Sequence, residues 1–245
     1  FRRTADDVVN EILRKEKQQQ RPKPQNKRLR AVLTREVEGQ EVNAKDVVFD
    51  WLAAELQQRD LHEHRTVVAV MDGETKLRDL QELKIRRAIG ILDIWHVTKY
   101  LWKLAYCFHR EGSEEAEAFV ETYLLKLLEG KVNRVIGGIR QMATKRGNLS
   151  KSKQEKLQQY LNYFAERRDY MKYDEYLAAG YPIGSGVVEG ACRHLVKDRM
   201  EQAGMRWRIA GAQAIISLRS IYVNEDWDAF HADRIQAEQR KLYPY

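Results

Sequence analysis

Cysteine is nearly absent from this chain. Its 245 residues include only Cys107 and Cys192, which lie far apart inside helical patterns. Neither shows the close pairing that zinc sites and disulfide-rich scaffolds use. The sequence therefore excludes a disulfide framework and a cysteine-based zinc centre, and it indicates two reduced core thiols in a cytosolic protein.

Long apolar runs are also missing. No stretch reaches the roughly 20 consecutive apolar residues that a membrane-spanning helix needs, and no basic segment followed by an apolar one opens the chain as a secretion leader. These absences predict a cytoplasmic protein with no membrane partner. The chain starts at Phe1 without an initiator methionine, so we also expect it to be a fragment.

A large excess of one charge is missing too. The 43 lysines and arginines exceed the 36 aspartates and glutamates enough to give a formal net charge of +7, but the two signs are interspersed. A local basic bias of this kind favours a polyanionic partner, nucleic acid above all. With 43% hydrophobic residues, the chain can bury one substantial core and carry an inserted subdomain.

Basic side chains gather near the N-terminus. Residues 14–30 contain eight bases and one acid, and Pro22 and Pro24 favour an extended backbone there. The bases are Arg14, Lys15, Lys17, Arg21, Lys23, Lys27, Arg28 and Arg30. One interpretation is a strip that lies along a nucleic-acid backbone, with the last three as contacts; the alternative is a solvated linker. Residues 28–37 alternate apolar and polar side chains, which predicts a strand.

Two apolar runs are each followed by an aspartate. Residues 66–71 predict a strand buried on both faces, and residues 88–92 predict a second one; Asp72 follows the first and Asp93 the second. Carboxylates at such strand ends lie at the rim where open α/β sheets build their sites. Gly73 indicates tight backbone packing beside Asp72. The alternative is that Asp72 caps a turn or the next helix.

His96 follows Asp93 by three residues. A histidine there can orient a phosphate or a carboxylate, although a lone histidine is a weak signal for a metal ligand. Beyond it, residues 97–180 contain helical patterns and no strand pattern, which predicts an all-helical insertion. Ser152 and Glu155 form a capping-box pattern that opens one of its helices.

A glycine-rich turn at residues 181–186 leads into a helix that carries Glu189. Glu189, Arg193 and Lys197 recur every four residues, which places one acid and two bases on one helical face. Such a face suits a phosphodiester, because the carboxylate can hold a cation while the bases meet phosphate oxygens. We interpret Glu189 as a metal ligand; the alternative is an exposed ladder of charges.

Further along, Trp207 lies between Arg206 and Arg208 in a turn. An aromatic ring between guanidinium groups can stack on an unpaired base while its neighbours hold phosphate. The alternative is a core tryptophan beneath a helix end. We expect a final helix at 209–223 and a polar tail at 224–245.

Four segments together resemble the ISKra-type transposases of bacterial insertion sequences, a branch of the DDE enzymes. They are Val67–Gly73, Ile91–Trp102, Tyr173–Arg193 and Lys197–Trp207, and the similarity runs from about Asn26 to Trp227. The resemblance implies a mixed α/β fold: an RNase H-like core sheet with flanking helices and a large all-α insertion before the final catalytic helix. The expected parts are a basic N-terminal helix and linker (1–27), the first part of the core (28–110), the helical insertion (111–180), the final core helices (181–223) and a C-terminal tail (224–245).

The resemblance also implies roles for the acids. Asp72 corresponds to the second acid of a three-acid site, Glu189 to the third, and Asp93 with His96 to an accessory element in which Asp93 is a reserve metal ligand. The implied cofactor is Mg²⁺ or Mn²⁺, which activates water or a DNA 3′-hydroxyl and stabilises the leaving oxygen. Nothing in residues 1–27 matches the first acid, so we expect the chain to begin just after the strand that carries it.

The predicted function is metal-dependent DNA cleavage and strand transfer by a transposase core. The expected partners are double-stranded DNA at transposon ends and target sites and a second copy of the chain, in the bacterial cytoplasm and on the nucleoid. The predicted DNA contacts are Lys27, Arg28, Arg30, Arg193, Lys197, Arg206, Trp207 and Arg208. The alternative is a catalytically inactive DNA-binding or assembly remnant, which the missing first acid favours. A serine hydrolase is disfavoured, because Ile183 replaces the first glycine of a nucleophile elbow at Ser185.

Overall fold

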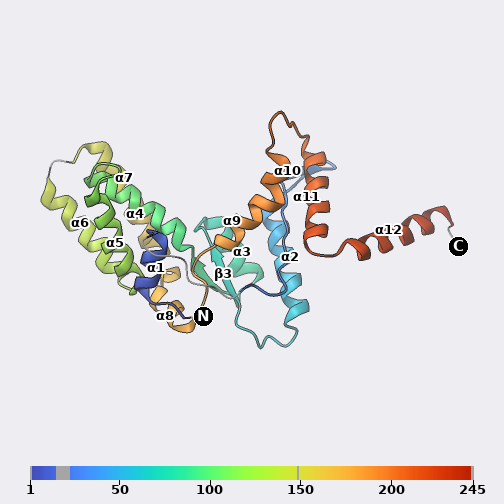
Figure 1. Ribbon diagram of the computed structural model, residues 1–245, viewed down its shortest axis with the longest axis horizontal. Coiled ribbons are helices and arrows are strands. Elements are labelled where there is room, and N and C mark those ends of the chain that lie inside the picture. The colour runs from blue at the N-terminus through green and yellow to red at the C-terminus, as the bar shows by residue number, and fades with distance from the viewer. Residues whose placement is uncertain (1, 15–22, 148, 244–245) are drawn as a thin grey trace. The chain divides into compact units, whose positions relative to one another are not determined.

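The computed structural model describes residues 2–14, 23–147 and 149–243 (Figure 1). Helices make up 65% of this structure, and its strands form only two two-stranded sheets. The expected mixed α/β fold with an RNase H-like core sheet is therefore wrong. The described part of the chain contains no central sheet, because only two of the expected strands pair with each other and the third segment finds other hydrogen-bond partners.

The chain divides into two compact units. The first joins Phe1–Pro22 to Arg65–Ser185, and the second joins Lys23–His64 to Gly186–Tyr245. Residues 28–110, expected to be one part of a core, are thus shared between the two units.

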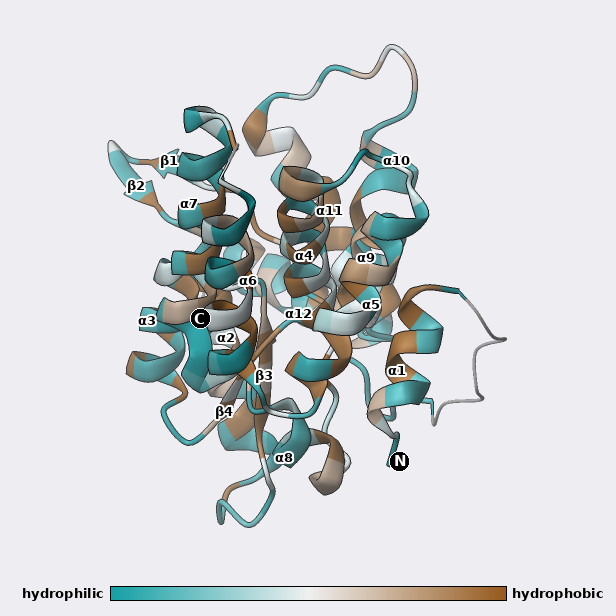
Figure 2. Ribbon diagram, turned by 90° about the vertical axis from the view of Figure 1, so that its left-hand side faces the viewer, coloured by the Kyte–Doolittle hydropathy of each residue, from teal (hydrophilic) through white to brown (hydrophobic). Residues whose placement is uncertain are grey.

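The sheet of the first unit consists of two parallel strands. β3 (Val68–Met71) and β4 (Ile89–Leu92) pair in register from Val68 opposite Ile89 to Met71 opposite Leu92, and α3 (Thr75–Lys84) connects them. The two predicted apolar strands are confirmed. In Figure 2 both strands are coloured mainly as hydrophobic, but all four residues of β3 are only half-buried, so the expected burial of this strand on both faces is not reached.

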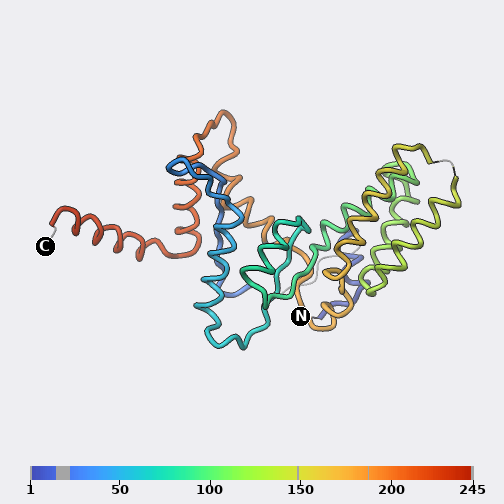
Figure 3. The backbone as a smooth tube through the Cα atoms, turned by 180° about the vertical axis from the view of Figure 1, so that it is seen from behind, coloured from blue at the N-terminus to red at the C-terminus, as the bar shows by residue number. Residues whose placement is uncertain are grey.

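A helical block forms the rest of the first unit. Its elements are α1 (Ala5–Ile12), α4 (Ile94–Phe108), α5 (Glu114–Leu128), α6 (Val132–Arg146), α7 (Lys151–Arg167), the 3₁₀ turn η1 (Arg168–Tyr170) and α8 (Tyr173–Ala179). Figure 3 shows α4 to α7 running alongside one another. The core lies between them: Leu101 and Leu104 of α4, Leu124 of α5 and Phe164 of α7 are completely buried. Among the described residues from 97 to 180 no strand occurs, as the sequence predicts.

Side-chain caps fix where these helices begin. Thr4 and Asp7 form a capping box for α1, which ends at Ile12. Ser113 caps α5 by accepting a hydrogen bond from the Ala116 amide. The expected capping box at Ser152 is wrong, because Ser150 caps α7 by accepting a hydrogen bond from the Lys153 amide.

The second unit begins with an extended segment and a hairpin. β1 (Arg35–Val37) and β2 (Gln40–Val42) pair in antiparallel fashion around Gly39, and α2 (Ala44–Arg59) follows with Asn43 as its cap. The strand expected over residues 28–37 forms only in its last three positions.

Side-chain amides take the place of a neighbouring strand for the extended residues 28–34. The amide group of Asn224 accepts from the Leu29 N–H at 2.7 Å and donates to the Leu29 carbonyl at 2.9 Å. The Gln213 side chain bonds the Leu33 N–H and the Ala31 carbonyl in the same way. The alternating pattern thus gives an extended backbone. Its hydrogen bonds are made with the side chains of Gln213 and Asn224 and not with a neighbouring strand.

Five further helical segments complete the second unit. They are α9 (Gly186–Cys192), the π-helical turn η2 (Arg193–Lys197), α10 (Asp198–Met200), α11 (Ile209–Val223) and α12 (Trp227–Leu242). The final helix at 209–223 is confirmed. The expected polar tail at 224–245 contains the helix α12, none of whose residues is buried. Of the two cysteines, both free, Cys107 is buried as expected and Cys192 is exposed.

The backbone beside Asp72 leaves no room for a side chain. Gly73 has φ of +84°, and a Cβ there would lie 2.5 Å from both Leu92 Cδ1 and the Tyr163 hydroxyl. We expect Gly73→Ala to lower the free energy of unfolding by about 2 kcal/mol or more in urea titrations, since positive φ and the clash add. Gly112→Ala is the matched control: its φ is +76° but its surroundings are open, so it should cost only about 1 kcal/mol. Equal losses of unfolding free energy in the two variants would contradict the close packing of Leu92 and Tyr163 around Gly73.

Candidate functional site

Two aspartates lie next to each other at the carboxyl ends of the parallel strands. Met71 pairs with Leu92, so Asp72 and Asp93 are the next residues on neighbouring strands, which are about 4.8 Å apart in a sheet. The Asp93 amide also donates to the Met71 carbonyl at 2.8 Å. The prediction that each acid directly follows a buried strand is confirmed.

Asp72 presents a partly unengaged carboxylate. It is exposed, and its Oδ1 accepts the Glu74 N–H at 3.0 Å. Its Oδ2 has no hydrogen-bond partner among the residues that the structure describes. Glu74, not Asp72, occupies the N-cap position of α3, but the bond from the Glu74 N–H makes Asp72 the side-chain cap of the turn before that helix, as the alternative expected. An exposed carboxylate oxygen on a fixed strand end fits the requirements of a hard divalent cation.

Asp93, in contrast, is buried, and its carboxylate accepts hydrogen bonds from other parts of the protein. Its side chain is only 4% exposed, and it caps α4 by accepting the Trp95 N–H at 3.0 Å. The same carboxylate accepts the Ser185 amide at 3.3 Å and the Ser185 hydroxyl. A buried carboxylate needs such partners, so Asp93 joins the start of α4 to the turn after α8 and has little capacity left for a metal ion.

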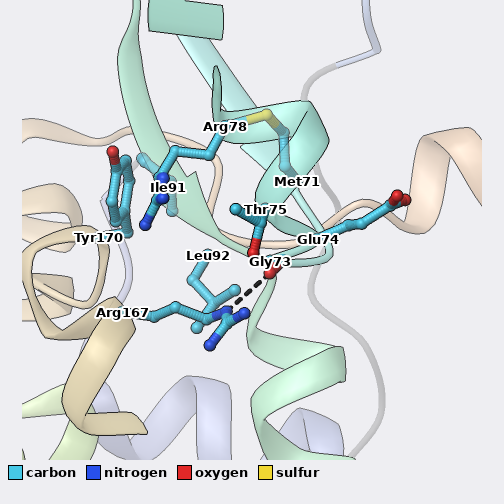
Figure 4. A pocket seen from close by; sticks show the side chains of 9 residues that line it. All are labelled: Met71, Gly73, Glu74, Thr75, Arg78, Ile91, Leu92, Arg167 and Tyr170. Atoms are coloured by element: carbon cyan, nitrogen blue, oxygen red, sulfur yellow. Dashed lines mark hydrogen bonds between the residues drawn. The ribbon is translucent and has the colours of Figure 1, made fainter. Parts of the chain in front are cut away.

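Aromatic and guanidinium groups from α7 hold the loop that carries Asp72. The Tyr163 hydroxyl donates to the Asp72 carbonyl at 2.8 Å, and Arg167 Nε donates to the Gly73 carbonyl at 2.6 Å (Figure 4). The guanidinium of Arg167 lies 4.2 Å from the Tyr163 ring centre, and that ring stacks on Tyr100 at 3.9 Å. The position of Asp72 is therefore set by residues far away in the sequence.

The neighbouring strand end is held by another tyrosine. The hydroxyl of Tyr173, a fully buried residue of α8, donates to the Leu92 carbonyl at 2.7 Å. Sequence reasoning missed Tyr163, Arg167 and Tyr173. The only linear signal is the four-residue spacing of Tyr163 and Arg167, which predicts a shared helix face but not its target 91 residues away.

A small pocket lies on the other side of this loop. Figure 4 shows its lining, which includes Met71, Arg78, Leu92, Arg167 and Tyr170. Its volume is about 20 Å³, enough for one water molecule. Burial, followed by the hydrogen bond to Glu82 at 2.6 Å, raises the pKa of Tyr170 to about 12. The pocket is too small for a substrate, so the chemistry of this region belongs to the exposed side of Asp72.

His96 lies in the first turn of α4, three residues after Asp93. It is half-buried, and its ring centre lies 6.1 Å from that of Tyr100. No hydrogen bond or ion pair of His96 occurs among the described residues. The structure thus places His96 on the same helix start as Asp93 without giving it a partner.

Glu189 belongs to the second unit. It lies on α9 and is exposed, as are Arg193 and Lys197 after it. None of the three has an ion-pair partner in the described ranges. Because Arg193–Lys197 is a π-helical turn with i to i+5 hydrogen bonds, the regular four-residue face expected from the sequence does not continue through it.

Trp207 is anchored to its own turn. Its indole N–H donates to the Met200 carbonyl at 3.2 Å, and the Arg199 guanidinium lies 5.8 Å from its ring centre. The ring is 36% exposed, so it is neither a core residue nor a free stacking platform. Arg206 and Arg208 on either side are exposed and have no acidic partner within the described part of the chain.

The basic residues near the N-terminus differ from one another. Two guanidinium nitrogens of Arg28 lie 2.6 and 2.7 Å from the two carboxylate oxygens of Asp226, and this hydrogen bonding raises the pKa of Arg28. Arg28 therefore has a structural partner. Arg30 lies 5.8 Å above the Trp51 ring, and Lys27 is exposed. The bases at positions 15, 17 and 21 lie outside the described residues.

The structure brings Asp72 and Asp93 together in the first unit and places Glu189 in the second. Among the described residues, no three histidine, cysteine, aspartate or glutamate side chains form a group that could hold a metal ion. No described helix has both the length and the apolar character needed to cross a membrane.

Comparisons with known proteins identify no relative. No protein-family model matches the chain, and no curated protein and no solved structure matches it either. Its function is therefore inferred from its own residues.

The position of Tyr163 predicts a loss of stability at high pH. Burial raises the pKa of Tyr163 well above its usual value near 10, and Tyr100, Asp72 and Asp93 raise it further, whereas Arg167 lowers it. The unfolded chain releases this proton first, so the stability that Tyr163 contributes is present below about pH 10 and is lost as pH rises through the folded pKa. Plotted against pH from 9 to 12, the unfolding free energy should fall less steeply in Tyr163→Phe than in the parent chain. Tyr222→Phe, at a 71% exposed position, should leave the slope unchanged; an unchanged slope in Tyr163→Phe would contradict the placement of this side chain.

Proposed function

We propose that the chain is the DNA-processing part of a transposase that cuts and joins DNA strands with Mg²⁺ or Mn²⁺. The observation that carries this proposal is the exposed Asp72 carboxylate, which the strand end, Tyr163 and Arg167 hold in place while one of its oxygens stays unengaged. Rigidly held carboxylates that face solvent are the ligands that phosphoryl-transfer metal sites use. The resemblance to ISKra-type transposases supports the same function.

The acids have different roles in this proposal. Asp72 is the metal ligand that the first unit supplies, because it is exposed and has no ion-pair partner in the described ranges. Glu189, an exposed acid of the second unit, is a metal ligand on the strength of the resemblance alone. Asp93 positions the strand end through its cap and its bonds to Ser185, and His96 supports the site from the same helix. When bound, the divalent cation activates water or a DNA 3′-hydroxyl and stabilises the leaving oxygen.

Exposed bases of the second unit supply contacts to the DNA backbone. Arg193, Lys197, Arg206 and Arg208 face solvent without acidic partners in the described ranges, which is the arrangement that phosphate contacts require. In this proposal the protein works as a homodimer on double-stranded DNA at transposon ends and target sites, in the bacterial cytoplasm at the nucleoid.

A second candidate function is DNA binding without catalysis. The observation that favours it is the engagement of Asp93, whose carboxylate accepts three hydrogen bonds from Trp95 and Ser185. With Asp93 committed, Asp72 is the one of these two acids whose carboxylate keeps an oxygen without a partner in the described ranges. The two functions differ in whether DNA binding is accompanied by metal binding at Asp72.

Calorimetry separates the two functions. We expect Mn²⁺ to bind the parent chain, and Asp72→Asn to weaken that binding at least tenfold, since the amide keeps the Glu74 hydrogen bond but loses the charge. Asp79→Asn is the control, because Asp79 is an exposed acid of α3 that pairs with Arg78 and should not affect binding. Duplex DNA binding by the parent chain without any Mn²⁺ binding would establish the non-catalytic alternative.

The DNA contacts are tested by salt dependence. The double variant Arg206→Gln/Arg208→Gln should bind duplex DNA more weakly, and the slope of log affinity against log salt should fall by about two, one for each lost phosphate contact. Fluorescence anisotropy with a labelled duplex measures both quantities. Arg134→Gln/Arg140→Gln removes two exposed charges from α6 and should leave the slope nearly unchanged. Equal effects of the two double variants would mean that DNA responds only to net charge.

A further inference from the structure

The second unit contains a much larger pocket than the one beside Asp72. Its volume is about 310 Å³, within the range of small-ligand sites. The extended residues 28–35, α2 and α11 with its C-terminal end surround it, and Figure 1 shows α2 and α11 alongside each other. The lining residues on which the argument depends are Arg28, Arg30, Arg35, Trp51, Ser217 and Asp226.

The wall formed by the extended segment is held in a fixed position. The side chains of Gln213 and Asn224 each bond an N–H and a carbonyl of this segment at 2.7 to 3.4 Å. Arg28 adds a two-pronged ion pair to Asp226. These contacts close each end of the segment onto α11, so the pocket is a preformed feature of the second unit.

The charges around the pocket do not balance. Three arginines and one aspartate line it, and Asp226 is already paired with Arg28. Arg30 contacts the Trp51 ring at 5.8 Å, and Arg35 donates to the Leu33 carbonyl at 3.4 Å. Neither has an acidic partner in the part of the chain that the structure describes. Two guanidinium groups are thus left to meet an anion.

Further hydrogen-bond donors at the pocket lack acceptors. The Nε of Arg28 is buried with no hydrogen-bond partner, although the Glu55 carboxylate is 3.7 Å away. Ser217 is exposed, and its Oγ accepts the Gln213 amide at 3.0 Å, which leaves its own proton to donate at the open side of the pocket. A buried donor without an acceptor, such as Arg28 Nε, costs free energy unless a ligand or water satisfies it. The pocket therefore suits a ligand rich in acceptor oxygens.

We propose that this pocket binds one unpaired nucleotide of a DNA strand. Its phosphate lies between Arg30 and Arg35, where planar guanidinium groups suit phosphate oxygens, and its base lies on the apolar side formed by Val47 and Trp51. The volume accommodates a single nucleotide and excludes a duplex. The choice of DNA as the source of the nucleotide rests on the proposed function. The unbalanced charge of the pocket is an observation of the structure and is independent of that function.

The test uses the whole chain and four probes: a fluorescently labelled single strand of ten thymidines with a 5′-phosphate, thymidine 5′-monophosphate, inorganic phosphate and a blunt duplex. We expect the single strand to bind, with Arg30→Gln and Arg35→Gln each weakening it about tenfold or more, as expected for a lost charged hydrogen bond to phosphate. Arg134→Gln, an exposed arginine of the first unit, should leave binding of the single strand unchanged. Circular dichroism and thermal unfolding of each variant check that it folds as the parent does.

The probes separate the sources of the ligand and the two proposals. Competition by thymidine monophosphate, but not by inorganic phosphate, supports a site that reads a whole nucleotide; equal competition by inorganic phosphate would overturn the nucleotide and leave only an anion site. Duplex binding without single-strand binding would overturn the pocket proposal while leaving the proposed function intact. Single-strand binding that Arg30→Gln and Arg35→Gln do not weaken would overturn it as well.

Discussion

The buried carboxylate of Asp93 is the interaction on which the first unit depends. It caps α4, the helix that packs against both α5 and α7, and it binds the amide and hydroxyl of Ser185 at the far end of the same unit. A charge that is 4% exposed is stable only with such partners. The Ile94 amide, donating to the Ile183 carbonyl at 2.9 Å, strengthens the same junction. The end of β4, the start of the helical block and the chain beyond α8 therefore share one anchoring point.

The two acids at the strand ends therefore differ in role: Asp93 has a structural role, and Asp72 is available to an external partner. Because Asp93 is satisfied by protein groups, Asp72 is the acid that can meet an external partner, and Tyr163 and Arg167 fix its loop through backbone carbonyls without engaging its carboxylate. The second unit has a comparable division. Arg28 holds the extended segment to Asp226, whereas Arg30 and Arg35 have no acidic partners in the described ranges and are the residues that the proposed nucleotide would meet. In each unit, one charged residue, Asp93 or Arg28, is used to hold the local structure, and a nearby residue of the same charge has no ion-pair partner in the described ranges.

The sequence predicts the local elements well and their assembly poorly. The continuous apolar runs before Asp72 and Asp93 identify the parallel strands, because each run is complete within a few residues. The central sheet was predicted wrongly, since alternation at residues 28–34 specifies an extended backbone but not its partner; Gln213 and Asn224, about 180 to 195 residues away, supply the hydrogen bonds that a strand would have made. The positions of Asp72 and Asp93 could be predicted, whereas the groups that hold them could not. No local pattern connects Tyr163 to Asp72 or Ser185 to Asp93.

The central claim is that a divalent cation binds at the exposed carboxylate of Asp72. Paramagnetic Mn²⁺ tests it directly, because the ion broadens the amide signals of residues close to it in a nitrogen-15 NMR spectrum of the whole chain. We expect substoichiometric Mn²⁺ to broaden the signals of Gly73 and Glu74 first and excess Mg²⁺ to restore them. Broadening confined to other acidic residues, with Gly73 and Glu74 still sharp, would contradict it.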